Sequence, residues 1–131
     1  MTFYHYTCDH GHTLIGEYGA LRTIGQRMPE VYQELGMSED QRLMYSLIWA
    51  TDLAEPDIEG LGLTKRVLSC ERWTHRYRIT NPLPLMPYSD MSYRFTLGFQ
   101  ADLVKPPAQP DHWWVSWRPL PVVYDPIEVA A

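Results

Sequence analysis

The stretch Phe3-Tyr4-His5-Tyr6-Thr7 is the most informative part of the sequence for the fold. This short apolar run directly precedes a segment with helical spacing. We expect a first β-strand over Phe3 to Thr7. A histidine at the end of a first strand can anchor a ligand whose polar edge reaches the strand backbone. The alternative is a structural His5 that is bonded inside the sheet, which is the commoner explanation of a single short motif.

The chain after this strand predicts short helices. Apolar residues recur at helical spacing from Leu14 to Leu21. Asp9 precedes them, and its carboxylate can cap a helix. Gly19 or Gly25 could end this helix.

Three shorter helical segments are expected further on. Residues 29–35 begin with a proline suited to a first turn and are followed by a glycine. The run Ser38-Glu39-Asp40-Gln41 has the form of a capping box and predicts a helix start. Residues 56–61 could form one helical turn.

Apolar and alternating patterns predict the remaining strands. Residues 47–51 form a short apolar strand, and residues 73–80 alternate so that one face packs and the other is wet or binds a ligand. Residues 112–117 form a strand rich in tryptophan. Val122 to Tyr124 is expected to be at most an edge strand, because prolines stand just before it.

The proline-rich segments between these strands predict loops. We expect irregular structure over residues 81–90 and 105–110. Residues 91–99 are ambiguous between a strand and a short helix. The order of strand, helices and then mainly strands predicts a single α+β domain over residues 1–131.

Composition narrows the function classes. The chain has 131 residues and a net charge of −5, which argues against a general nucleic-acid binder. Two cysteines give no disulfide framework, and neither a signal peptide nor a membrane-spanning run is evident. We therefore expect a cytoplasmic protein with no membrane association.

Side chains on the strands supply candidate binding contacts. Tyr45 or Trp49 could stack on a flat ring beside the strand that ends at Thr51, although an apolar strand with one tryptophan is usually core. Arg76 and Arg78 share a strand face and could hold a pyrophosphate. A solvated sheet face explains these two arginines equally well.

Asp111 and His112 stand at the mouth of the tryptophan-rich strand, after a proline-rich loop, where a catalytic acid or base is plausible. A strand cap is the alternative. Cys8, His10 and His12 have zinc-ligand identities, but residues two apart on a helix point in different directions. No metal is therefore expected.

Together these motifs resemble the ADP-ribosyltransferase superfamily, and within it the small toxin-like members related to the DNA-targeting DarT type. The matching residues are His5-Tyr6-Thr7, Gly19-Ala20-Leu21, Trp49-Ala50-Thr51-Asp52, and the region Asp111 to Val115 followed by Pro119 to Val122. The resemblance covers most of the chain in order. It implies a split antiparallel sheet with short helices after the first strand.

The resemblance also implies that NAD is the substrate, with ADP-ribose passed to an unidentified acceptor or NAD cleaved. The NAD-binding residues would be His5, Tyr6, Thr7, Tyr45, Trp49, Thr51, Arg76 and Arg78. The catalytic residues would be His5, Asp111 and His112. The sequence departs from the family in one respect, since no glutamate stands at the C-terminal strand and Asp111 or His112 occupies that place.

Two other functions remain open on the sequence. The first is a non-enzymatic inhibitor or adaptor that docks a protein partner or a second copy through an edge of Trp113, Trp114, Trp117 and Arg118. The second is a small-molecule hydrolase or isomerase that uses His5 or His112 as a base.

Overall fold

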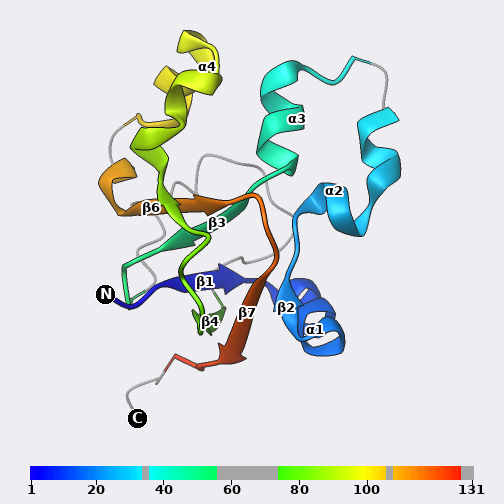
Figure 1. The fold of residues 1–131 in the computed structure, drawn as a ribbon, viewed down its shortest axis with the longest axis vertical. Helices are drawn as coiled ribbons and strands as arrows, with labels where there is room; N and C mark the ends of the chain where they lie inside the picture. The colour runs from blue at the N-terminus through cyan, green and yellow to red at the C-terminus, as the bar shows by residue number, and fades with distance from the viewer. Residues whose placement is uncertain (34–35, 56–73, 106–107, 128–131) are drawn as a thin grey trace.

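The computed structural model describes residues 1–33, 36–55, 74–105 and 108–127, and it has a small mixed α+β fold. Its centre is an antiparallel sheet with the strand order β2-β7-β4-β1-β3-β6-β5 (Figure 1). The strands are β1 (Tyr4–Thr7), β2 (Ala20–Leu21), β3 (Ile48–Thr51), β4 (His75–Ile79), β5 (Met86–Pro87), β6 (Trp113–Ser116) and β7 (Leu120–Tyr124). The predicted strands near residues 3–7, 47–51, 73–80 and 112–117 are thereby confirmed.

Short helices cover this sheet. The α-helices are α1 (Asp9–Tyr18), α2 (Ile24–Arg27), α3 (Glu39–Tyr45) and α4 (Leu97–Leu103). The 3-10 helices are η1 (Pro29–Gln33), η3 (Tyr88–Asp90), η4 (Ser92–Arg94) and η5 (Pro110–His112). None of the helices in the described ranges combines the length and apolarity needed to cross a membrane.

The first strand joins the two halves of the sheet. Tyr4 pairs with Thr51 of β3 on one side and with Arg78 of β4 on the other. We expected a split sheet, but this double pairing makes the order continuous across all seven strands. Because side chains alternate along a strand, Phe3, His5 and Thr7 lie on one face and Tyr4 and Tyr6 on the other.

Each face of the sheet carries its own apolar core. The core on the face of His5 contains Phe3, Ile15, Leu21, Ile48, Ala50, Tyr77, Ile79 and Leu120. The core on the opposite face contains Leu47, Tyr88, Met91, Phe95, Trp113 and Val115. α1 contributes to the first core, whereas α3 and α4 pack against the second (Figure 1).

Local sequence signals explain most helix ends. Gly19 ends α1 with a φ of +83°, a conformation that favours glycine. Ser38 begins α3 with the expected reciprocal capping box to Gln41. Asp9 was wrongly expected to cap α1, because Cys8 is the extended N-cap residue and Asp9 lies in the first turn. Leu21, which matched the helical spacing, belongs to β2.

Several boundaries differ from the sequence-based expectation. The helix expected over residues 29–35 is a 3-10 helix over Pro29–Gln33. The loop expected over residues 81–90 contains β5 and η3, and residues 91–99 hold η4 and the start of α4 rather than one element. The expected turn at residues 56–61 lies outside the described residues.

The expected edge strand near the C-terminus was wrong. β7 lies between β2 and β4, where it pairs through Pro121 with Ala20 and through Val122 with Ile79. Proline removes a donor but keeps its acceptor, and the Pro121 carbonyl accepts hydrogen bonds from the backbone N–H and the hydroxyl of Thr80. One missing N–H therefore does not exclude the strand from the sheet interior.

Candidate functional site

His5 projects from β1 and is held by the neighbouring strand. Its Nδ1 lies 2.7 Å from the backbone carbonyl oxygen of Trp49 in β3. A carbonyl can only accept a hydrogen bond, so Nδ1 carries the proton. This contact fixes the orientation of a half-buried imidazole at the junction of β1 and β3.

The two residues after His5 are buried and support the fold. Tyr6 donates its hydroxyl to the carbonyl of Leu53 at 2.8 Å, and burial raises the pKa of this phenol to about 12. Thr7 packs against α1 so closely that a Cβ on Gly11 would fall 1.9 Å from the Thr7 Oγ1. Both side chains therefore stabilise the fold next to His5.

Trp49 lies on the face of the sheet opposite His5. Its ring packs in the second core, with centroids 5.7 Å from Tyr88 and 6.1 Å from Trp113. Tyr45 is the last residue of α3 and is half-buried. Thr51 is buried, and its hydroxyl accepts from the backbone N–H of Leu53. Trp49 and Thr51, which were expected to line a ligand cleft together with His5, thus lie on the opposite face of the sheet.

Arg76 and Arg78 also project on the face opposite His5, as the pairing of β4 with β1 requires. Arg76 donates Nε to the backbone carbonyl of Asp125 at 2.9 Å and Nη2 to its carboxylate at 3.2 Å. Its Nη1 donates to the carbonyl of Ala54. Arg78 is exposed. The other basic residues of that region, Lys65, Arg66 and Arg72, lie outside the described residues.

His112 forms an ordered pair with an aspartate that the sequence did not single out as a site residue. Its Nδ1 lies 2.6 Å from Asp52 Oδ1, and the indole Nε1 of Trp114 lies 3.4 Å from Asp52 Oδ2. The side chains of His112 and Asp52 are 40 % and 17 % exposed. Asp111, the expected catalytic carboxylate, is exposed in the first turn of η5.

Sheet register explains the Asp52–His112 pair. Thr51 of β3 stands opposite Trp113 of β6, so the next residue of one strand meets the preceding residue of the other. The signal for this pair was present in the sequence as an aspartate ending one strand and a histidine starting another. Finding it requires knowing that β3 and β6 are neighbours, and local patterns do not show this.

The chemistry of this pair follows from its hydrogen bonds. An ionised Asp52 carboxylate can only accept, so the proton between the two groups resides on His112 Nδ1. His112 Nε2 has no hydrogen-bond partner within the described residues and is the nitrogen that can take or give a proton. A histidine oriented by a carboxylate is the usual arrangement of a general base.

His5 and His112 share one face of the sheet. Trp114, whose indole reaches Asp52, also contacts Phe3, with ring centroids 4.7 Å apart. Phe3 and His5 point to the same side of β1. Strand spacing places the Cα atoms of His5 and His112 about 12 Å apart, two strands across and two residues along. Of the three expected catalytic residues, His5 and His112 therefore lie on the same face of the sheet, while Asp111 is exposed to solvent.

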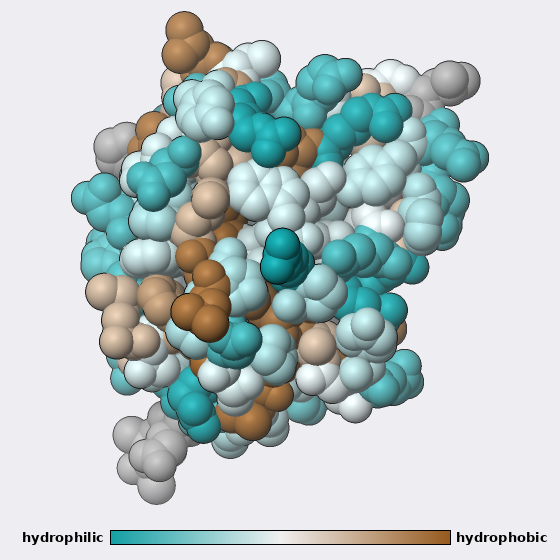
Figure 2. Space-filling model, in the orientation of Figure 1, coloured by the Kyte–Doolittle hydropathy of each residue, from teal (hydrophilic) through white to brown (hydrophobic). Residues whose placement is uncertain are grey.

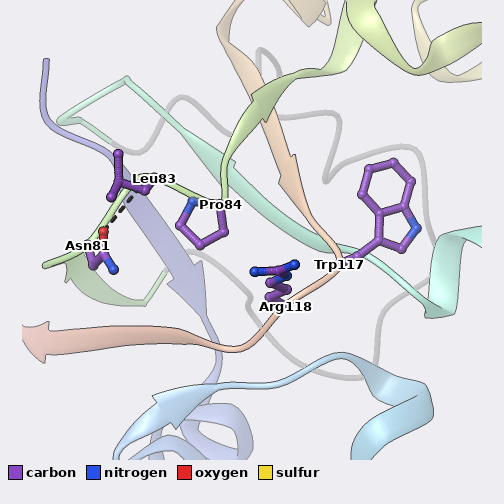
Figure 3. Close-up of a pocket in the computed structure, with 5 residues that line it drawn as sticks. All are labelled: Asn81, Leu83, Pro84, Trp117 and Arg118. Carbon is purple, nitrogen blue, oxygen red and sulfur yellow. Dashed lines mark hydrogen bonds between the residues drawn. The ribbon is translucent and has the colours of Figure 1, made fainter.

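An open surface pocket of about 470 Å³ lies beside the turn between β6 and β7. It is lined by Asn81, Leu83, Pro84, Trp117 and Arg118 (Figure 3). Arg118 lies between the proline-bearing loop and the indole of Trp117 in this view. Near the middle of the molecule, Figure 2 shows apolar side chains next to strongly hydrophilic ones.

The four residues expected to form a docking edge do not all lie at this pocket. Trp113 is buried in the second core, and Trp114 packs against the first. Trp117 and Arg118 stand at the pocket, and the guanidinium of Arg94 lies 5.3 Å from the Trp117 ring centroid.

Cys8 and His12 are two of the three residues near the N-terminus that have zinc-ligand identities. Cys8 is buried before α1, and His12 Nδ1 lies 2.6 Å from the hydroxyl of Tyr77. Among the described residues, no group of three His, Cys, Asp or Glu side chains is arranged to hold a metal ion.

No protein-family model matches this chain. Searches of the curated proteins and of the solved structures found no match either.

Proposed function

We propose that the protein binds NAD on the face of the sheet that carries His5 and His112, and transfers ADP-ribose to an acceptor. The observation that carries this proposal is the pairing of His112 with Asp52 on the same face as His5. The resemblance of the His5-Tyr6-Thr7 strand to ADP-ribosyltransferases supplies the ligand class. In this proposal β1 and β3 are the strands of an ADP-ribosyltransferase-like core.

The proposed roles follow from the hydrogen bonds. His5, clamped on the Trp49 carbonyl, would bind the nicotinamide ribose. Asp52 would place a negative charge near the ribosyl cation that forms as nicotinamide leaves with the bonding electrons. His112 Nε2 would take the proton from the acceptor group whose oxygen or nitrogen bonds to the ribose carbon.

Asp111 provides a matched comparison for the role of His112. Both residues lie in η5. Of the two, only His112 is hydrogen-bonded to the carboxylate of another residue within the described part of the chain, Asp52. With NAD alone, water is the acceptor that His112 would deprotonate as it bonds to the ribose carbon. We therefore expect His112→Gln to slow nicotinamide release at least about 100-fold, the lower range for loss of a positioned acid or base. Asp111→Asn should stay within a few fold of the unmodified protein.

The deciding measurement is NAD binding by titration calorimetry, followed in parallel by chromatographic assay of released nicotinamide. Saturable binding that His5→Ala removes would support the NAD site. Binding retained in His112→Gln without nicotinamide release would support its proposed role. The absence of heat at millimolar NAD, with all variants folded by circular dichroism, would refute the proposal.

We infer a second candidate function, a binding module, from the pocket at Trp117 and Arg118. Tryptophan and arginine are the residue types that most often anchor protein interfaces, and this pair stands at the surface. A second copy of the chain is the simplest partner. Sedimentation equilibrium over a concentration series tests it: Arg118→Glu should abolish association, and a monomer at every concentration would refute dimerisation.

A further inference from the structure

A cluster of titratable rings joins α1, β4 and β7, away from the Asp52–His112 pair. The imidazoles of His12 and His75 are stacked with centroids 4.1 Å apart and planes 9° apart. The ring of Tyr124 packs against both, at 4.5 Å from His12 and 5.8 Å from His75. Tyr77 adjoins Tyr124 at 5.2 Å.

Within this cluster, three side chains form a continuous hydrogen-bonded chain. Asp9 Oδ1 lies 2.6 Å from His75 Nε2, and His75 Nδ1 lies 2.9 Å from the Tyr124 hydroxyl. The carboxylate can only accept, so the proton on the neutral imidazole resides on Nε2. His75 Nδ1 then has a lone pair directed at Tyr124, whose hydroxyl donates to it.

We propose that Asp9, His75 and Tyr124 form a second reactive site, in which His75 is the general base and Tyr124 the nucleophile. A carboxylate that sets the histidine tautomer, and a histidine that takes a hydroxyl proton, are the parts of an activated nucleophile. Such an activated oxygen attacks an electrophilic centre that carries a leaving group, and a phosphoryl or sulfonyl centre is the substrate class that we assign to it.

The exposures of the three residues suit these roles. Tyr124 is 45 % exposed, so its hydroxyl can meet a reagent, whereas the His75 side chain is only 16 % exposed and is held between rings. Asp9 is 87 % exposed and contributes little to stability, because water screens such pairs. It acts as a positioning residue through the tautomer of His75.

Arylsulfonyl and alkylsulfonyl fluorides allow a test without a known substrate. With phenylmethanesulfonyl fluoride, the Tyr124 oxygen bonds to sulfur, the S–F bond breaks and fluoride leaves with the bonding electrons. The phenolic proton passes to His75 Nδ1. No oxidant, reductant or further reactant is needed.

Tyr93 is the internal control, because its side chain is 77 % exposed and has no hydrogen-bond partner within the described residues. Peptide mass spectrometry over a time course of labelling at neutral pH gives both rates in one sample. We expect Tyr124 to react about 100-fold faster than Tyr93, the lower range for a positioned base. Exposure alone would give the opposite order.

Two variants separate base catalysis from local accessibility. His75→Gln removes the base, and Asp9→Asn removes the carboxylate at an exposed position where the fold is least affected. Each should bring the Tyr124 rate down to that of Tyr93, while the Tyr93 rate stays constant. Should His75→Gln fail to fold, Asp9→Asn decides. Equal or slower labelling of Tyr124 in the unmodified protein, or fast labelling that survives Asp9→Asn, would overturn the proposal.

Discussion

Gly11 in α1 lies so close to Thr7 at the end of β1 that a Cβ on the glycine would fall 1.9 Å from the Thr7 hydroxyl oxygen. The helix therefore packs on the strand that carries His5 so closely that no side chain fits at residue 11 without a shift. Gly11→Ala should lower the free energy of unfolding by about 1–3 kcal/mol, the usual cost of overpacking. Urea denaturation measures this change.

A second glycine of the same helix supplies the matched control. A Cβ on Gly16 would meet no atom within 4 Å. Gly16→Ala should stabilise the protein by up to about 1 kcal/mol, because alanine is the better helix former. Equal effects of the two substitutions would show that the contact with Thr7 does not limit the packing of α1.

Tyr6 predicts a loss of stability at alkaline pH. Burial raises the pKa of its phenol to about 12, against an ordinary value of 10.0, and the charge of Arg76 lowers it only in part. Below pH 10 the phenol is neutral in the folded and the unfolded chain, and this contribution is fully present. As pH rises from 10 to 12 the unfolded chain ionises first, so stability falls.

The two-unit difference sets an upper limit of about 2.7 kcal/mol on the loss from Tyr6. Urea denaturation at a series of pH values from neutral to 11 measures the part of this loss that falls below pH 11. Tyr6→Phe should flatten this pH dependence, while Tyr93→Phe, at an exposed tyrosine, should leave it as in the unmodified protein. An unchanged slope in Tyr6→Phe would show that its phenol does not govern the alkaline limb.

Local signals in the sequence predicted where helices and strands lie better than they predicted which strands pair. The capping box at Ser38 and the glycine at position 19 act within a few residues, so the sequence alone locates them. The alternation over β4 likewise identified a strand. The place of β7 inside the sheet could not be read in this way, because it depends on pairing with Ala20 and Ile79.

The same distinction explains the candidate site. His5 and His112 were identified from their positions at strand ends, but Asp52 became a partner of His112 only through the register of β3 and β6. Trp49 was expected to stack on a ligand across a cleft from His5. Its assignment to the opposite face follows from strand alternation once the pairing with β1 is known.

Asp40 links α3 to α4 through hydrogen bonds. Its two carboxylate oxygens accept from the backbone N–H of Thr96 at 2.9 Å and from the Thr96 hydroxyl at 2.6 Å. Thr96 is the N-cap residue of α4, so Asp40 orders the start of that helix. Asp40→Ala should cost about 1–2 kcal/mol, near the lower end of the range for hydrogen bonds to a charged group, because these bonds are exposed.

Glu39 is the control for Asp40, since it is the neighbouring acidic residue in the first turn of α3. Glu39→Ala removes a similar interaction with the helix dipole, worth less than about 1 kcal/mol, without touching α4. Amide hydrogen exchange should show faster exchange in α4 for Asp40→Ala only. Equal exchange in both variants would refute the link.

We expect Tyr88→Phe to leave the free energy of unfolding almost unchanged, although Tyr88 is buried. Its ring packs in the second core with 3 % exposure, while its hydroxyl has no hydrogen-bond partner within the described residues. An unpaired buried hydroxyl carries a desolvation penalty, which Tyr88→Phe removes while keeping the ring. The free energy of unfolding should stay within about 0.5 kcal/mol of the unmodified value or rise.

Tyr77→Phe is the contrast, because that hydroxyl lies 2.6 Å from His12 Nδ1, and its loss should cost about 1 kcal/mol. Thermal unfolding of both variants measures the difference, and a larger loss in Tyr88→Phe would mean that its hydroxyl is paired in solution.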